Sequence, residues 1–278
     1  MEMSEEFLRL SHDHDWHVDN VASNNNGVWV VDRGRPESTF ADKVHTGVAE
    51  IEAKSLWFEV RNRLIVDYLS AMGMPRSIWE VGSGTGIVAR ELALAGCTVV
   101  AVEPSISGAA AAARGGIPSI ASSLESLNLP TRSLSTIGLF DVIEHLKEPQ
   151  ELLAECHRVI KPGGCLFLTV PALPKLWSYS DEVLGHYRRY TRNSLSREVE
   201  DSGFVVRDCS YRLWSLVLPV AIVRSLPYRL GVKGDQERVG RQLGHSSPAL
   251  AWTLIRLDRA VGGLLPFGTS LFATAVPK

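Results

Sequence analysis

The stretch Ser77–Glu103, SIWEVGSGTGIVARELALAGCTVVAVE, predicts a strand, a glycine-rich turn, a helix and a second strand. Its first strand is apolar on both faces apart from Glu80, which is typical of a strand buried between two layers. The three glycines of Gly82–Gly86 allow positive φ angles and let a ligand approach the backbone. Helical spacing follows, Gly96 suits the end of that helix, and the second apolar strand ends at Glu103. We therefore expect a turn whose N–H groups face an anion, with a carboxylate at the tip of the neighbouring strand.

The acidic residues around this turn bear on the identity of its ligand. A dinucleotide fingerprint, G-x-G-x-x-G, requires glycine at position 87, where the chain has Ile87. Glu80 would repel a pyrophosphate, but it suits a ligand that carries an ammonium and a sulfonium group. S-adenosylmethionine has both, together with a carboxylate for the helix N-terminus and a ribose diol for Glu103. An ordinary tight turn between strand and helix is the alternative.

Five segments resemble the class I S-adenosylmethionine-dependent methyltransferases. They are EVGSGTG (80–86), AVEPS (101–105), FDVIEHL (140–146), ELLAECHRVIKPGG (151–164) and CLFLTVP (165–171). The resemblance implies an α/β fold, with a Rossmann-like seven-stranded sheet, helices on both faces, an N-terminal helix and a helical cap. We expect an N-terminal tail and lid helix over residues 1–70. The methyltransferase domain would then span 71–278, with the cap inserted at about 212–267.

The same resemblance implies which residues hold the cofactor. The expected cofactor-binding residues are Arg61, Glu80, Gly82, Ser83, Gly84, Thr85, Gly86, Glu103, Pro104, Ser105, Ser123, Leu124, Phe140, Asp141 and Val142. Arg61 can form a charge-assisted pair with the cofactor's carboxylate, and a packing helix with an exposed arginine is the alternative. Near the adenine the family often has an acidic or polar side chain, whereas this chain offers serines and the backbone N–H of Leu124.

Two histidines are the catalytic candidates. By resemblance His145 lies near the transferred methyl group, and a histidine can accept a proton from a hydroxyl near neutral pH. A structural histidine that orients its loop is the alternative. WF-x-x-RN (57–62) and GHYRRY (185–190) are similar to a bacterial subgroup that modifies glycans, lipids or secondary metabolites. Within the second motif His186 is the better general-base candidate. The expected substrate-contacting residues are Trp57, Phe58, Tyr187, Arg188, Arg189 and Tyr190. The two arginines suit an anionic or sugar-like acceptor, and equally suit internal ion pairs that fix the loop.

Composition narrows the classes of protein. A hydrophobic content of 45% is ample for a core, and a net charge of −2 gives no reason to expect nucleic acid. The four cysteines form no C-x-x-C pair and indicate buried thiols in a reducing compartment. The acidic start lacks an apolar signal core, so we expect a cytoplasmic protein. His12, His14 and His17 alternate with aspartates, which in a polar tail indicates solvated surface, so we expect no metal.

The remaining segments complete the predicted order of elements. Leu134–Phe140 predicts a strand, and Thr191 is the expected N-cap of a helix that runs to about Ser202. No apolar run approaches the roughly 20 residues of a membrane span. In the cap, residues 212–230 contain the apolar run Leu213–Val223, which arginines flank. They indicate either a helical flap that closes the active site or a surface for peripheral membrane contact.

The function that the sequence predicts is methyl transfer from S-adenosylmethionine to a small-molecule acceptor, with S-adenosylhomocysteine as the product. The transfer would be O- or C-directed, on a glycan, a lipid or a secondary metabolite. The alternatives are a cyclase or decarboxylase that uses the bound cofactor without methyl transfer, and a binding module without activity. An NAD-dependent oxidoreductase is disfavoured by Ile87 and Glu80.

Overall fold

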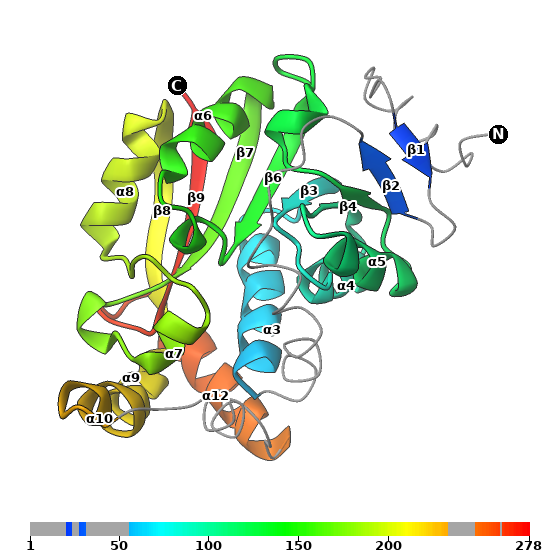
Figure 1. Cartoon of the computed structure of the whole chain (residues 1–278). Helices are drawn as coiled ribbons and strands as arrows, with labels where there is room; N and C mark the ends of the chain where they lie inside the picture. Colours follow the sequence, from blue (N-terminus) through cyan, green and yellow to red (C-terminus); the bar gives the residue numbers. More distant parts are fainter. Residues whose placement is uncertain (1–20, 24–27, 32–55, 233–247, 262) are drawn as a thin grey trace.

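The computed structural model describes residues 21–23, 28–31, 56–232, 248–261 and 263–278. These residues form a nine-stranded sheet with helices on both faces (Figure 1). The strands are β1 (Val21–Ser23), β2 (Val28–Val31), β3 (Ser77–Val81), β4 (Thr98–Val102), β5 (Ser119–Ala121), β6 (Leu134–Phe140), β7 (Ile160–Pro171), β8 (Phe204–Arg212) and β9 (Ser270–Pro277). The longer helices are α3 (Leu56–Ala71), α4 (Ile87–Leu94), α5 (Ile106–Arg114), α6 (Pro149–Val159), α8 (Arg192–Asp201) and α12 (Pro248–Val261). The short helical segments are η1 (Glu125–Leu127), η2 (Ile143–His145), η3 (Pro174–Leu176), α7 (Tyr179–Val183), η4 (Trp214–Leu216), α9 (Val217–Val220), η5 (Ala221–Ser225) and α10 (Leu226–Arg229).

The sheet order is β1-β2-β5-β4-β3-β6-β7-β9-β8. Strands β2 to β7 of this order pair in parallel, whereas β9 is antiparallel to both β7 and β8. The seven strands from β5 to β8 confirm the predicted Rossmann-like arrangement. The hairpin of β1 and β2 was not predicted, and it extends the sheet beyond β5 through the pairing of Val28 with Ser119.

Each face of the sheet has its own hydrophobic core, because alternate residues of a strand point to opposite faces. Trp79 and Val81 of β3 pack with residues of α6 and α8. Ile78, which precedes Trp79 and points to the opposite face, packs with residues of α3, α4 and α12. β3 is buried from Ile78 to Val81, as its two-sided apolar pattern predicted.

The order of the strands reverses beside β3, because β4 lies on one side of it and β6 on the other. All three strands are parallel, so their carboxyl ends meet at one edge of the sheet. The chain leaves this edge at Gly82, at Glu103 and at Asp141. Open α/β sheets bind ligands at such a switch point, and the predicted site residues follow these three strands.

The cap rests on the chain segment 174–183, just before the loop that carries His186. Ser225 Oγ donates a hydrogen bond to the carbonyl of Leu176 at 2.8 Å, and Arg229 Nη2 donates to the carbonyl of Lys175 at 2.7 Å. Several apolar side chains of the cap are exposed, namely Leu218, Ile222, Val223, Leu226 and Leu230. No helix in the described part of the chain combines the length and the apolar character needed to cross a membrane. Peripheral membrane contact through residues 212–230 stays a prediction.

Candidate cofactor and acceptor site

The glycine turn after β3 bends toward the neighbouring strand β4. The backbone N–H groups of Gly82 and Ser83 both donate to the carbonyl of Val102, at 2.8 and 3.3 Å. Gly82, Gly84 and Gly86 all have positive φ, at 72°, 54° and 75°. Gly86 is the N-cap of α4, and no described side chain caps that helix. The N–H groups at the start of α4 therefore lie beside the turn, where an anion would be favoured.

Glu103, at the tip of β4, is fixed by the backbone on both sides of its carboxylate. Gly84 N donates to Oε2 and Ser105 N donates to Oε1, each at 2.8 Å. Helix α5 approaches closely enough that a Cβ at Gly108 would lie 2.9 Å from both Glu103 Cγ and the carbonyl oxygen of Gly84. Glu103 is thus buried and held in one orientation against the turn, as a binding residue at this position requires.

The segment that follows β5, on the other side of β4 from β3, presents serines as the sequence indicated. Ser122 N donates to the carbonyl of Glu103 at 3.2 Å, which places this segment beside the strand tip. Ser123 Oγ is used within its own turn, since it bonds to Ser126 Oγ and accepts from Ser126 N. The side chain of Leu124 is fully buried in the core. Only the backbone of Leu124 remains for the predicted contact with adenine.

At the end of β6, Asp141 joins three elements. Its φ is 56°, a left-handed value that is uncommon for a residue other than glycine. Its Oδ2 lies 2.6 Å from Arg61 Nε of α3, and its Oδ1 accepts a hydrogen bond from Thr169 Oγ1 of β7 at 3.1 Å. Arg61 also donates to the carbonyl of Phe140 at 3.3 Å. The structure therefore places Arg61 at the predicted methionine end of the site, where it pairs with Asp141.

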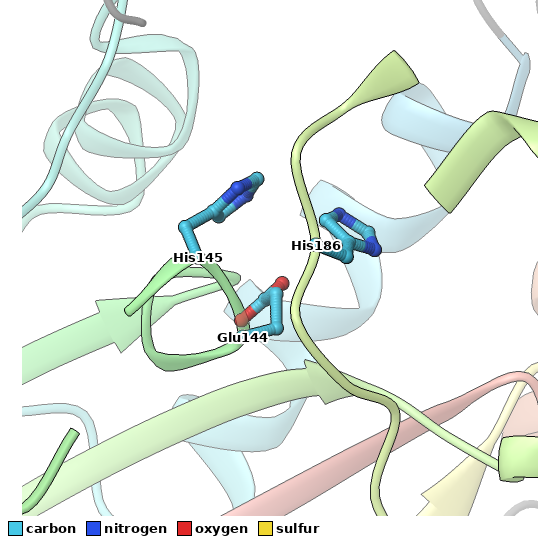
Figure 2. Close-up of side chains that lie close together, drawn as sticks. All are labelled: Glu144, His145 and His186. Atoms are coloured by element: carbon cyan, nitrogen blue, oxygen red, sulfur yellow. The ribbon is translucent and has the colours of Figure 1, made fainter. Parts of the chain in front are cut away.

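Glu144, His145 and His186 form a cluster just beyond Asp141. Figure 2 shows the Glu144 carboxylate below the two imidazole rings, so that the three side chains form a triangle. One ligand atom from each of the three side chains lies within 4.8 Å of the other two. The rings of His145 and His186 meet edge to face, with centroids 4.7 Å apart. Glu144 is completely buried, and burial, reinforced by the charge of Asp141, raises the pKa of its carboxyl group well above the usual range.

His186 is oriented by a buried carboxylate. Its Nδ1 lies 3.0 Å from Asp181 Oδ1, and Arg189 Nε donates to the same oxygen at 2.7 Å. The other oxygen of Asp181 accepts from the backbone N–H of Ser178 at 2.9 Å. Burial alone would raise the pKa of Asp181, but the hydrogen bonds from His186 and Arg189 and the positive charge of Arg189 outweigh it, so the pKa lies below its usual value. An ionised Asp181 favours the tautomer that leaves Nε2 of His186 as an acceptor.

A family described as a methyltransferase domain matches residues 54–208, which is more than half of the chain. The chain belongs to this methyltransferase domain family. It is 27% identical over 163 residues to a probable S-adenosylmethionine-dependent methyltransferase of Mycobacterium tuberculosis, covering 57% of this chain and 59% of the relative. It is also 27% identical over 149 residues to the ubiquinone biosynthesis O-methyltransferase of Pseudomonas syringae pv. tomato, covering 50% of this chain and 62% of the relative. The chain thus spans about six tenths of the length of these relatives.

Solved structures with a similar fold confirm the predicted Rossmann-like α/β architecture. A protein of Thermotoga maritima described as an S-adenosylmethionine-dependent methyltransferase, possible histamine N-methyltransferase, gives a TM-score of 0.56 at 16% identity, covering 84% of this chain and 98% of that one. The [4+2]-cyclase SpnF gives a TM-score of 0.50 at 18% identity, covering 78% of this chain and 81% of that one. At these identities the likeness concerns the fold alone.

The remaining residues that were predicted to contact the substrate differ in their exposure to solvent. Tyr187 is exposed, whereas Arg188 donates to the carbonyls of Leu146 and Lys147 at 3.0 and 2.6 Å. Tyr190 packs in the core beside α8, and burial raises the pKa of its hydroxyl. The arrangement of Arg188 and Arg189 favours the alternative of internal pairs that fix the loop, and the burial of Tyr190 favours a packing role.

Two residues of the site, Glu144 and Asp181, were not selected from the sequence, although both lie within five residues of a selected histidine. Glu144 precedes His145 directly, and Asp181 lies five residues before His186. For Glu144 the sequence offered one signal, an acidic residue next to a histidine after a buried strand. The burial of Glu144 and Asp181, however, is shown only by the folded structure. The structure does not describe the side chain of Trp57 or the histidines at positions 12, 14 and 17. The ring of Phe58 lies beside Arg61, whose Cζ is 5.7 Å from the ring centroid.

Proposed function

We propose that this protein is an S-adenosylmethionine-dependent methyltransferase that acts on a small-molecule acceptor. The observation that carries the proposal is the fixed carboxylate of Glu103 beside the glycine turn, at the point where the strand order reverses. Membership of the methyltransferase domain family and the printed names of the relatives support it.

The residues of the turn fit this cofactor. Ser83 Oγ is buried and has no hydrogen-bond partner among the described residues, so a bound ligand would satisfy it. A carboxylate oxygen can accept two hydrogen bonds, so ribose hydroxyls can share Glu103 with the backbone N–H groups that already fix it. The open N-terminus of α4 suits a carboxylate. S-adenosylmethionine supplies a methyl group on positively charged sulfur, and the chain supplies binding and orientation.

The acceptor would meet the cofactor at the cluster of Glu144, His145 and His186. These side chains follow the same sheet edge as Asp141, so they adjoin the predicted methionine end of the cofactor site. Two imidazoles beside a carboxylate suit an acceptor that must lose a proton, which favours a hydroxyl over an amine. We therefore propose transfer to oxygen, on a glycan, a lipid or a secondary metabolite, with His186 and His145 assisting the loss of that proton.

The first test is binding, because it needs no knowledge of the acceptor. Isothermal titration calorimetry should show one S-adenosylhomocysteine bound per chain, and Glu103→Gln should weaken binding by about tenfold or more, since one charge-assisted bond is worth about 1.5–3 kcal/mol. The matched control is Glu151→Gln, which neutralises an exposed carboxylate on α6. A folded wild-type protein that binds neither S-adenosylmethionine nor its product would refute the proposal.

The second test is turnover with a panel of hydroxylated sugars, lipids and phenols. A methyltransferase forms one S-adenosylhomocysteine for each methylated acceptor, and mass spectrometry should place the added methyl on oxygen. An enzyme that used the cofactor without transferring its methyl group would convert its substrate and form no S-adenosylhomocysteine. That result would favour the cyclase or decarboxylase alternative.

A further inference from the structure

No direct contact in the described structure would neutralise the negative charge of the Glu144 carboxyl group in its ionised form. Its side chain is completely buried, and neither oxygen has a hydrogen-bond partner among the described residues. Arg61 and Arg189 influence it from a distance, but Arg61 lies 2.6 Å from Asp141 and Arg189 lies 2.7 Å from Asp181. Buried carboxylates are normally paired or bound to metal ions, because an isolated buried charge is expensive. The position therefore suits a cation that enters the cluster.

The two histidines beside Glu144 supply the donors that such a cation needs. A ring nitrogen of His145, a ring nitrogen of His186 and an oxygen of Glu144 lie within 4.8 Å of one another, close enough to contact one ion after small side-chain adjustments (Figure 2). His145 and Glu144 come from η2, whereas His186 comes from a distant loop. The loop is tied to η2 by a hydrogen bond from Tyr187 N to the carbonyl of Glu144 at 2.8 Å. The donor set is therefore held together by the backbone.

His186 has the supporting contact that is typical of a metal ligand. Its Nδ1 bonds to Asp181 Oδ1 at 3.0 Å, and Asp181 is fixed by Ser178 and Arg189. In metal sites a ligating histidine usually donates its other ring N–H to a carboxylate, which fixes the ring and strengthens the ligand. The same contact directs Nε2 of His186 away from Asp181. A buried carboxylate without hydrogen bonds and a carboxylate-oriented histidine are two independent observations that indicate the same site.

We propose that Glu144, His145 and His186 bind one divalent metal ion of the first transition series, such as Mn²⁺ or Zn²⁺. Two imidazoles and one carboxylate favour these ions over Mg²⁺, which prefers oxygen donors throughout. Three protein ligands leave positions open for an acceptor. This role rests on the proposed function. A hydroxyl that binds the ion becomes more acidic, its proton passes to solvent water, and the electron pair stays on the oxygen. The two histidines then assist the loss of the proton as ligands of the ion, in place of accepting it as free bases.

The experiment measures ion binding to the full chain without cofactor. Protein freed of metal with a chelator is titrated with MnCl₂, ZnCl₂ and MgCl₂ by calorimetry, and Mn²⁺ electron paramagnetic resonance reports nitrogen coupling from bound imidazole. The wild type should bind one Mn²⁺ with nitrogen coupling. Glu144→Gln and His186→Gln should each weaken binding by about 100-fold, at the upper end of the loss known for groups that support a ligand. Circular dichroism and thermal unfolding verify that the variants fold, and Glu144→Gln keeps the size of the side chain if His186→Gln does not fold.

His157→Gln is the matched control, since His157 packs against Phe204, with ring centroids 5.3 Å apart, and does not belong to the cluster. It should bind Mn²⁺ as the wild type does. The inference is overturned if the wild type binds no ion, if Mg²⁺ binds in preference to Mn²⁺, or if both cluster variants bind as well as the wild type, which would assign binding to histidines elsewhere. S-adenosylhomocysteine binding on the same samples separates the two proposals. Cofactor binding without metal overturns only this inference, whereas metal binding without cofactor overturns only the proposed function.

Discussion

Gly82→Ala should destabilise the protein through two separable costs. Gly82 has a φ of 72°, and an alanine in this region loses about 1–2 kcal/mol relative to its preferred conformations. A Cβ at position 82 would also lie 2.8 Å from Cγ2 and 3.0 Å from Cγ1 of Val142, which is closer than side chains normally pack. Overpacking of this kind costs about 1–3 kcal/mol. The free energy of unfolding should therefore fall by about 2–5 kcal/mol in total.

Two further variants separate these costs. Gly96→Ala serves as the backbone control, because Gly96 has a φ of 92° and a Cβ there would meet no atom within 4 Å. It should lose only the conformational part, about 1–2 kcal/mol. Val142→Ala removes the methyl groups that a Cβ at position 82 would meet. In the double variant Gly82→Ala/Val142→Ala the steric cost should disappear, which gives a coupling energy of about 1–3 kcal/mol.

Urea denaturation at equilibrium measures all four corners of this cycle, and S-adenosylhomocysteine titration shows whether affinity follows the same pattern. A loss for Gly82→Ala no greater than that for Gly96→Ala would refute the reasoning. So would a coupling energy below about 0.5 kcal/mol, the level at which independent sites add. Either result would mean that Val142, at the end of β6, does not confine the turn after β3.

Two other predictions follow from buried carboxylates. Glu103→Gln leaves one acceptor oxygen for the N–H groups of Gly84 and Ser105, so the unfolding free energy should fall by about 1–3 kcal/mol. Thermal unfolding with and without S-adenosylhomocysteine measures this, and a melting temperature equal to that of the wild type would contradict it. Burial raises the pKa of Asp258 above 3.8, and this effect exceeds the lowering by the hydrogen bond from the backbone N–H of Leu213. The folded state therefore holds the proton of Asp258 more tightly than the unfolded state. The contribution of Asp258 to the stability of the wild type therefore falls as the pH rises through the pKa that Asp258 has in the folded state. The stability of Asp258→Asn relative to the wild type should then increase as the pH rises above about 4, and a difference in urea midpoints that does not change with pH would count against it.

The central strands and the glycine turn after β3 could be predicted because their signals are local. β6 spans Leu134–Phe140 as predicted, and Thr191 caps α8, accepting from Ser194 N at 3.1 Å. The hairpin of β1 and β2 could not be predicted in the same way. Its strands have three and four residues, and β2 is held by pairing with β5, almost a hundred residues later. Propensity in so short a segment is too weak to outweigh its polar surroundings.

The proposed acceptor end of the site depends on contacts that the spacing of residues in the sequence does not reveal. Arg188 and Arg189 were expected at the substrate because two arginines beside aromatic residues suit an anion. In the folded chain Arg189 pairs with Asp181, and Arg188 donates to carbonyls about 40 residues away. The partners of Arg188 cannot be assigned from spacing, because they depend on how the loop folds back over the end of η2. Asp181 lies only eight residues before Arg189, but spacing alone does not show that the two side chains pair. Glu144 was overlooked for the same reason, since its burial results from that closure.

Asp141 lies where the two ends of the site meet, and its strained backbone follows from that position. The cofactor end is fixed by local hydrogen bonds around β3 and β4, whereas the acceptor end is fixed by loops from distant parts of the chain. A φ of 56° costs about 1–2 kcal/mol for an L-residue and persists only where neighbours impose it. Arg61 and Thr169 supply that constraint by holding its two carboxylate oxygens from α3 and β7. The turn at Asp141 directs the chain into η2, so the strain at this one residue places Glu144 and His145 beside the predicted position of the methyl group.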